Sequence, residues 1–119
     1  AYPWLSASAG VIVNITDIYA ERPKANHAVY CASKAGLAGL TRALARDLGP
    51  TVRVNGVAPG AILWPEIGDS VEQIRLLNRT PLARPGDPAD IAGAVLYLVQ
   101  APYVTGQIIA IDGGRSVVD

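Results

Sequence analysis

Residues 11–16 read Val11-Ile12-Val13-Asn14-Ile15-Thr16, a short run in which every side chain except that of Asn14 is β-branched. Such a run is typical of a strand that is covered on both faces, as strands are in a parallel sheet. Residues 51–57, ended by Ala58-Pro59-Gly60, and residues 107–112 are also interpreted as strands. We therefore expect three short strands.

A long helix is expected between the first two strands. Residues 27–48 contain no proline and are dominated by alanine and leucine, Asn26 is a candidate N-cap, and Gly49-Pro50 supplies a stop. Strand, helix and strand form a βαβ unit with a right-handed crossover. Because this helix is apolar nearly all round, we expect it to be covered on more than one side, by its own sheet and by another helix or subunit.

Two more helices are predicted downstream. Ser70 and Gln73 resemble a capping box for a helix to about residue 78, and Asp87-Pro88-Ala89-Asp90 is typical of the start of a helix that runs to about residue 100. Strands that alternate with helices predict the α/β class with a doubly wound parallel sheet. Three strands alone make a poor sheet and the chain contains no methionine, so we interpret residues 1–119 as the C-terminal half of a single domain.

Composition excludes several classes of function. Half of the 119 residues are apolar, and ten basic side chains balance ten acidic ones, so neither nucleic acid nor an anionic membrane is an expected partner. No apolar run approaches the roughly 18 residues that span a bilayer. The single cysteine, Cys31, excludes an internal disulfide and fits a reducing, cytoplasmic location. His27 has no partner at ligand spacing, so we expect no metal site.

Candidate chemical groups gather at one edge of the predicted sheet. Ligands of open α/β sheets lie at the carboxyl ends of the strands. Asp17 follows the first strand, Pro59-Gly60 the second and Asp112-Gly113-Gly114 the third, while Tyr30 lies in the first turns of the crossover helix. We therefore expect these groups to converge.

Tyr30 and Lys34 stand four residues apart and so share one helix face. A surface pair is the plainer interpretation. However, an unused ammonium would be costly on so apolar a helix, and it would stabilise a phenolate, which suits acid–base catalysis. Gly60 is open to two interpretations, a simple turn or a place where a flat ring approaches the backbone. Trp64 is either a core residue or part of a substrate lid.

Four segments together resemble one family. In chain order they are Tyr30-Cys31-Ala32-Ser33-Lys34, residues 53–60, residues 104–107 and residues 112–114, and they are similar to the short-chain dehydrogenase/reductase family. The resemblance implies a Rossmann-like fold and a nicotinamide cofactor, and it places the nucleotide-binding half of the domain before residue 1. Arg53 and Asn55 are interpreted as structural.

Asp17 stands where this family normally has serine, and an aspartate there resembles the pteridine reductases, which use NADPH to reduce dihydropteridines or dihydrofolate. The resemblance implies that Tyr30 supplies the proton, that Asp17 makes a hydrogen bond with Tyr30 or with the substrate, and that Lys34 binds the nicotinamide ribose. The backbone of Pro59, Gly60 and Ile62 would support the nicotinamide, and Trp64 would line the substrate site.

Two alternatives stay open. The first is a reductase of a carbonyl, with a 3-oxoacyl-carrier-protein or sugar substrate and Asp17 incidental. The second is a non-catalytic fragment or oligomerisation module. We expect residues 1–119 alone to be inactive, and the whole protein to form a dimer or tetramer through the helix at 27–48.

Overall fold

Three parallel strands form the centre of the molecule in the computed structural model, which describes residues 3–4, 9–18, 25–60 and 71–118. β1 (Val11–Ile15), β2 (Arg53–Pro59) and β3 (Ile108–Ile111) lie in the order β1-β2-β3. Val11 pairs with Arg53, and Gly56 pairs with Ile108. The predicted α/β class with a parallel sheet is confirmed.

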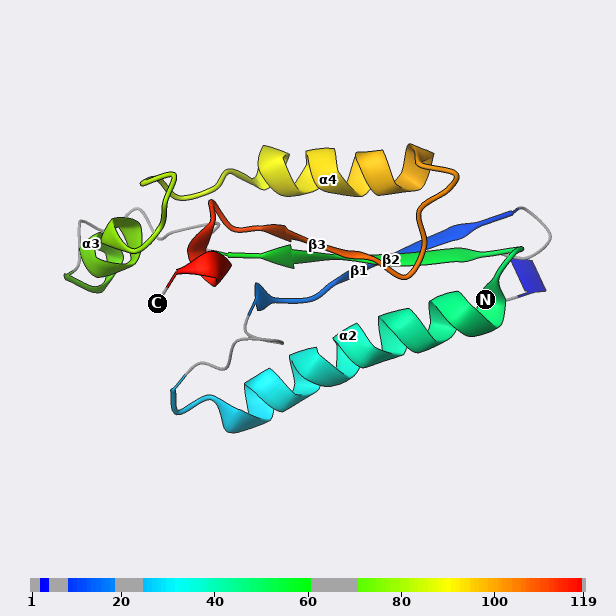
Figure 1. Cartoon of the computed structure of the whole chain (residues 1–119), viewed down its shortest axis with the longest axis horizontal. Helices are drawn as coiled ribbons and strands as arrows, with labels where there is room; N and C mark the ends of the chain where they lie inside the picture. The colour runs from blue at the N-terminus through cyan, green and yellow to red at the C-terminus, as the bar shows by residue number, and fades with distance from the viewer. Residues whose placement is uncertain (1–2, 5–8, 19–24, 61–70, 119) are drawn as a thin grey trace.

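Helices cover both faces of the sheet, so the fold has three layers (Figure 1). α2 (Ala28–Leu48) lies on one face and α4 (Pro88–Gln100) lies on the other. α3 (Val71–Asn78) lies beyond the carboxyl ends of the strands, and a short 3₁₀ helix, η2 (Arg115–Val117), follows β3. Because β1 and β2 are parallel and α2 connects them, the predicted βαβ unit is also confirmed.

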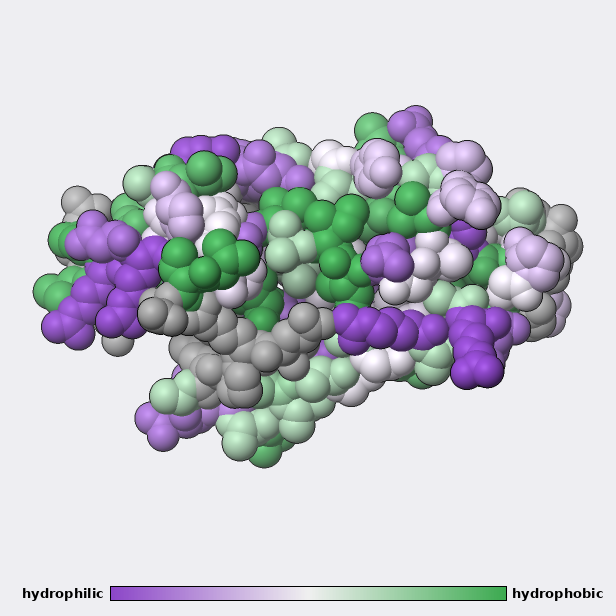
Figure 2. All heavy atoms as spheres, in the orientation of Figure 1, coloured by the Kyte–Doolittle hydropathy of each residue, from purple (hydrophilic) through white to green (hydrophobic). Residues whose placement is uncertain are grey.

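The core lies between the sheet and its two helices. Val54, Val57 and Leu98 are each 0% exposed. Ala45, Val52 and Val54 form a buried cluster against which Ile12, Leu44 and Leu48 pack. Full burial of a valine or leucine side chain contributes about 1.5–3 kcal/mol, so the centre of β2 is a principal source of stability. Figure 2 shows apolar side chains gathered in the band where the sheet lies, between α4 and α2.

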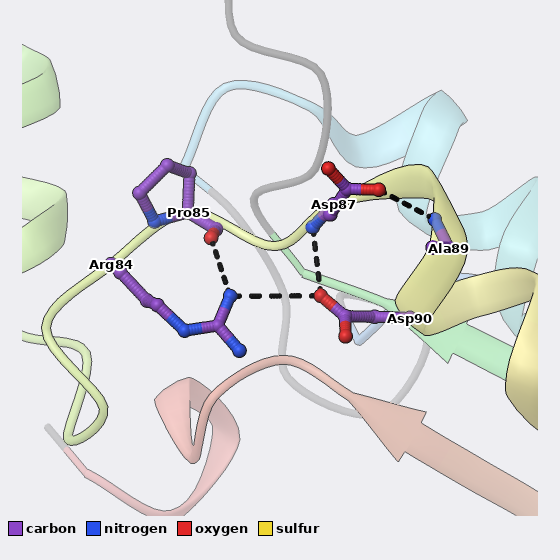
Figure 3. A network of polar contacts seen from close by, with 5 residues as sticks. All are labelled: Arg84, Pro85, Asp87, Ala89 and Asp90. Atoms are coloured by element: carbon purple, nitrogen blue, oxygen red, sulfur yellow. Dashed lines mark hydrogen bonds and ion pairs between the residues drawn. The ribbon is translucent and has the colours of Figure 1, made fainter.

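The start of α4 matches the sequence prediction. The Asp87 side chain accepts a 2.8 Å hydrogen bond from Ala89 N, and Asp87 N donates a 2.8 Å hydrogen bond to Asp90 Oδ2. Arg84 Nη1 lies 3.6 Å from the same Asp90 oxygen (Figure 3). The reciprocal bonds form a capping box that satisfies two backbone donors at the start of the helix.

The predicted cap of α2 is wrong. Asn26 has a φ of 62°, in the left-handed region, whereas an N-cap residue takes an extended backbone. His27 occupies the N-cap position instead and makes no side-chain cap hydrogen bond. Ser70, the predicted cap of α3, lies outside the described residues.

α2 is covered on one face within this chain. Cys31, Ala38, Thr41 and Ala45 are buried, whereas Val29 is 83% exposed and Leu40 is 51% exposed. The second covering expected for this apolar helix is thus absent from the described part of the chain.

Arg53 and Asn55 are structural, as expected. Arg53 Nη1 and Nη2 donate 2.8 Å hydrogen bonds to the carbonyls of Leu98 and Val99 at the end of α4. Asn55 donates to Val104 O and accepts from Gln107 N, and so fixes the loop that enters β3. Within the described ranges, no helix is long and apolar enough to cross a membrane, and no group of three or more His, Cys, Asp or Glu residues could hold a metal ion.

Candidate active site

Asp17 is held at the end of β1 by its neighbours in the chain. Thr16 is 2% exposed, and both its backbone N (2.8 Å) and its Oγ1 (3.3 Å) donate to Val57 O. Ile18 is 6% exposed. Because buried residues flank Asp17 on both sides, its carboxylate projects from a fixed stretch of backbone.

The phenol of Tyr30 meets that carboxylate. Tyr30 Oη donates a hydrogen bond of 2.5 Å to Asp17 Oδ2, although the two residues are 13 positions apart. Tyr30 is 43% exposed, so the phenol can be reached from solvent. The expected meeting of these two side chains is confirmed.

Lys34 lies one turn further along α2 and completes the group. Its Nζ donates to Ile15 O over 3.4 Å and lies 5.9 Å from the centroid of the Tyr30 ring. At this distance the ammonium makes a cation–π contact with the ring. Asp17, Tyr30 and Lys34 therefore form one connected cluster at the carboxyl end of β1, where the first turns of α2 lie (Figure 1).

Pro59 and Gly60 lie at the same edge of the sheet, at the end of β2. Pro59 pairs with Ile111, and Gly60 N donates a 3.0 Å hydrogen bond to Ile111 O. A Cβ atom on Gly60 would lie 2.7 Å from Asp112 Cβ, so the close approach of Asp112 requires glycine here. This packing is a structural reason for Gly60 that the sequence did not reveal. Ile62 and Trp64 lie outside the described residues.

Asp112 organises the turn after β3. Its carboxylate accepts hydrogen bonds from Gly114 N (2.9 Å) and Ser116 N (2.8 Å). Burial raises the pKa of this carboxyl group, but the hydrogen bonds from Ser116 and Gly114 outweigh burial and hold the pKa below its ordinary value. The negative charge thus stabilises the turn.

A pocket of about 430 Å³ opens beside this turn, and sequence reasoning did not anticipate it. Its lining comes from the segment before α4, from the start of α4 and from the end of β3, and it includes Thr80, Leu82, Arg84, Asp90, Ala110 and Asp112. The available signal was the irregular segment at 80–86, since such loops at the edge of an α/β sheet often bind ligands. The pocket does not include Asp17, Tyr30 or Lys34.

Comparison with known proteins identifies similar sequences. A family model described as enoyl-(acyl carrier protein) reductase matches residues 1–116. A 3-oxoacyl-[acyl-carrier-protein] reductase of Bos taurus is 42% identical over 106 residues, which cover 88% of this chain and 44% of the relative. A dihydromonapterin reductase of Enterobacter sp. (strain 638) is 38% identical over 108 residues, which cover 91% of this chain and 45% of the relative.

Solved structures confirm the fold. The structure of a 7α-hydroxysteroid dehydrogenase complexed with NADH and 7-oxo glycochenodeoxycholic acid superimposes with a TM-score of 0.83 at 42% identity, over 95% of this chain and 47% of that one. The chain spans less than half the length of the curated relatives it matches, 44% to 48% for the first two. Because the family model matches residues 1–116 and the fold is shared with a solved relative, the chain belongs to the short-chain dehydrogenase/reductase family.

Proposed function

We propose that the protein carrying these residues is an NADPH-dependent reductase that reduces a C=N bond of a pterin, of the dihydrobiopterin or dihydrofolate type. The observation that carries this proposal is the 2.5 Å hydrogen bond between Tyr30 and Asp17. It joins a proton donor to a carboxylate at the ligand-binding edge of the sheet.

The carboxylate is the group that favours a pterin. A serine hydroxyl can donate a hydrogen bond to a carbonyl oxygen that gains negative charge, whereas a carboxylate would repel that oxygen. Asp17 can instead accept a hydrogen bond from a ring N–H or an amino group, and a pterin offers both. The similarity to the Enterobacter dihydromonapterin reductase supports the same substrate class.

The cluster fits a nicotinamide cofactor. The Lys34 ammonium has three donors, and its contact with Ile15 O uses one of them, so the others suit ribose hydroxyls. NADPH, when bound, supplies the hydride. Tyr30 then gives its hydroxyl proton, which Asp17 accepts as a hydrogen bond before substrate binds, to the neighbouring nitrogen of the substrate. The backbone at Pro59, Gly60 and Ile62 supports the nicotinamide, and Trp64 lines the substrate side.

Reduction of a carbonyl is the second candidate, and a specific observation favours it. The Bos taurus relative is a 3-oxoacyl-[acyl-carrier-protein] reductase and the solved relative is a 7α-hydroxysteroid dehydrogenase. Both names describe carbonyl or alcohol chemistry, and both proteins are as similar to this chain as the pterin relative is. In that case Tyr30 would protonate an oxygen and Asp17 would contribute only to the position of the phenol.

One assay separates the two candidates. The full-length protein is mixed with NADPH and, in turn, with dihydrobiopterin, dihydrofolate and an acetoacetyl thioester. Oxidation of NADPH is followed by the decrease in its absorbance. Turnover of the pterin or the folate supports the proposal, and turnover of the thioester alone refutes it. Parallel runs with NADH test the choice of cofactor, and a Tyr30→Phe variant shows whether the activity arises at this site.

We also propose that the protein forms a dimer or tetramer through the outer face of α2. Val29 and Leu40 lie exposed on this face, and covering them would remove apolar surface from water. Light scattering on the full-length protein and on a Leu40→Glu variant tests this proposal. A wild-type oligomer that the variant breaks is the expected result, and an unchanged mass would contradict the choice of face.

A further inference from the structure

A part-buried hydrogen bond joins β1 to the middle of α2, outside the cluster of Asp17, Tyr30 and Lys34. Asn14 Nδ2 donates to Thr41 Oγ1 over 3.0 Å, and Thr41 is 0% exposed. The Thr41 hydroxyl donates its own hydrogen to Leu37 O over 2.8 Å. Because the helix backbone takes that hydrogen, the hydroxyl faces Asn14 as an acceptor of fixed direction. The proposed proton transfer uses neither residue.

The contact around this pair is mostly apolar. The other buried residues of α2 are Cys31, Ala38 and Ala45, and the partly buried Leu44 and Leu48 pack against the core. Apolar contacts have no preferred direction, so they define the position of a helix along its neighbour less sharply than a hydrogen bond does. A polar pair inside an apolar contact defines that position well, because a displaced helix would leave buried polar groups without partners.

The position of α2 along β1 matters directly at the cluster. Asn14, Ile15 and Asp17 lie close together along the chain, and they contact Thr41, Lys34 and Tyr30 of α2 respectively. An O–H···O hydrogen bond holds only between about 2.5 and 3.0 Å, so a slip of α2 by about 1 Å separates Tyr30 from Asp17.

We propose that Asn14 and Thr41 are positioning residues, whose hydrogen bond holds α2 in the register that places Tyr30 against Asp17. Neither residue touches the reacting atoms. The inference rests on the proposed function only in that Tyr30 is taken as the proton donor. It holds equally for a pterin and for a carbonyl substrate.

Thr41→Val tests the pairing, because valine keeps the shape of threonine and removes the acceptor. We expect kcat of the full-length protein to fall about tenfold, since misplacement of a catalytic group by about 1 Å has effects of this order or larger. Thr41→Ser retains the hydroxyl and should restore most of kcat. Thr51→Val is the matched control, since Thr51 is exposed and its hydroxyl donates to Leu48 O at the far end of α2 from the cluster.

A second measurement separates positioning from a general loss of stability. In a Tyr30→Phe background the phenol is gone, so Thr41→Val should have no further effect on kcat. An equal loss of kcat in both backgrounds would overturn the proposal. If Thr41→Val does not fold, Asn14→Leu combined with Thr41→Val removes the unpaired amide as well, and the same comparison is made with that double variant.

A crystal structure of the Thr41→Val variant tests the positioning role without an activity assay. We expect the separation of Tyr30 Oη and Asp17 Oδ2 in crystals of the Thr41→Val protein to exceed 3.5 Å. A separation still near that of the parent would overturn the inference. If no substrate in the assay above turns over, the proposed function fails, and this distance still tests the positioning role.

Discussion

The phenol of Tyr30 and the carboxylate of Asp17 lie 2.5 Å apart and so connect the first turns of α2 to the end of β1. Tyr30 is exposed enough to meet a ligand, while Asp17 is fixed between the buried residues Thr16 and Ile18. An exposed donor and a backbone-anchored acceptor therefore share one hydrogen bond. This geometry suits a proton donor that must keep one orientation.

Tyr30→Phe should lower kcat by at least about 10²-fold, because general acid–base catalysis contributes about 10²–10⁴-fold. Cofactor binding should weaken far less, since Lys34 is retained. Steady-state kinetics and NADPH titration of the full-length protein measure both quantities. Tyr103→Phe is the matched control, because Tyr103 is fully exposed, and a loss of activity there would show that the effect is not specific to Tyr30.

Asp17→Ser should abolish reduction of a pterin while leaving Tyr30 in place, because serine offers a shorter side chain and no negative charge to accept from a ring N–H. Asp17→Asn, which keeps the shape and removes the charge, should show a similar loss. Full retention of pterin turnover by either variant would contradict the role given to the carboxylate. Thermal melting of both variants controls for loss of folded protein.

The sequence predicted the layers and the edge of the sheet at which the cluster lies. It did so because a short β-branched run is typical of a strand, whereas a long, proline-free segment rich in alanine and leucine is typical of a helix. Strand ends were less accurate: β2 was expected at 51–57 and lies at 53–59, because Val52 N donates to Leu48 O in the turn after α2. Local composition does not show such a turn.

The contact of Gly60 with Asp112 also escaped prediction. It joins residues 52 positions apart that directly follow the neighbouring strands β2 and β3, and the sequence gives no information about how closely two backbones approach. The Asn26 cap was wrong for a similar reason, since a positive φ depends on how the whole turn closes. By contrast, the α4 cap was predictable because all its parts lie within four residues.

Arg53→Gln should lower the free energy of unfolding by about 2–3 kcal/mol, since hydrogen bonds to a charged group contribute about 1.5–3 kcal/mol. The guanidinium donates hydrogen bonds to the carbonyls of Leu98 and Val99 in the last turn of α4. Because that turn contains no basic residue, Arg53 supplies the positive charge that the C-terminal end of a helix favours. Denaturant titration measures the change. Arg84→Gln is the control, because its ion pair with Asp90 is exposed and should contribute less than about 1 kcal/mol.

Asp112 should make stability depend on pH in the acid range. Its folded-state pKa lies below the unfolded value near 3.8, so its contribution is fully present above that value. The contribution is lost as the pH falls through the folded-state pKa, when the carboxylate that binds Ser116 and Gly114 becomes protonated. Unfolding curves measured from pH 6 downward should therefore show a smaller acid-dependent loss for Asp112→Asn than for the parent. Equal slopes for the two proteins would show that other carboxyl groups dominate.

Gly60→Ala should disturb the end of β2. The added Cβ would lie 2.7 Å from Asp112 Cβ and 2.9 Å from Asp112 Cα, so the backbone itself must move. Overpacking of this kind costs about 1–3 kcal/mol, and the turn held by Asp112 should shift with it. Gly36→Ala is the matched control: nothing lies within 4 Å of its added Cβ, and alanine in a helix interior should raise stability by about 0.5–1 kcal/mol. Denaturant titration measures the free energy of unfolding of both variants. Equal changes at the two positions would mean that Asp112 can move aside without a loss of stability.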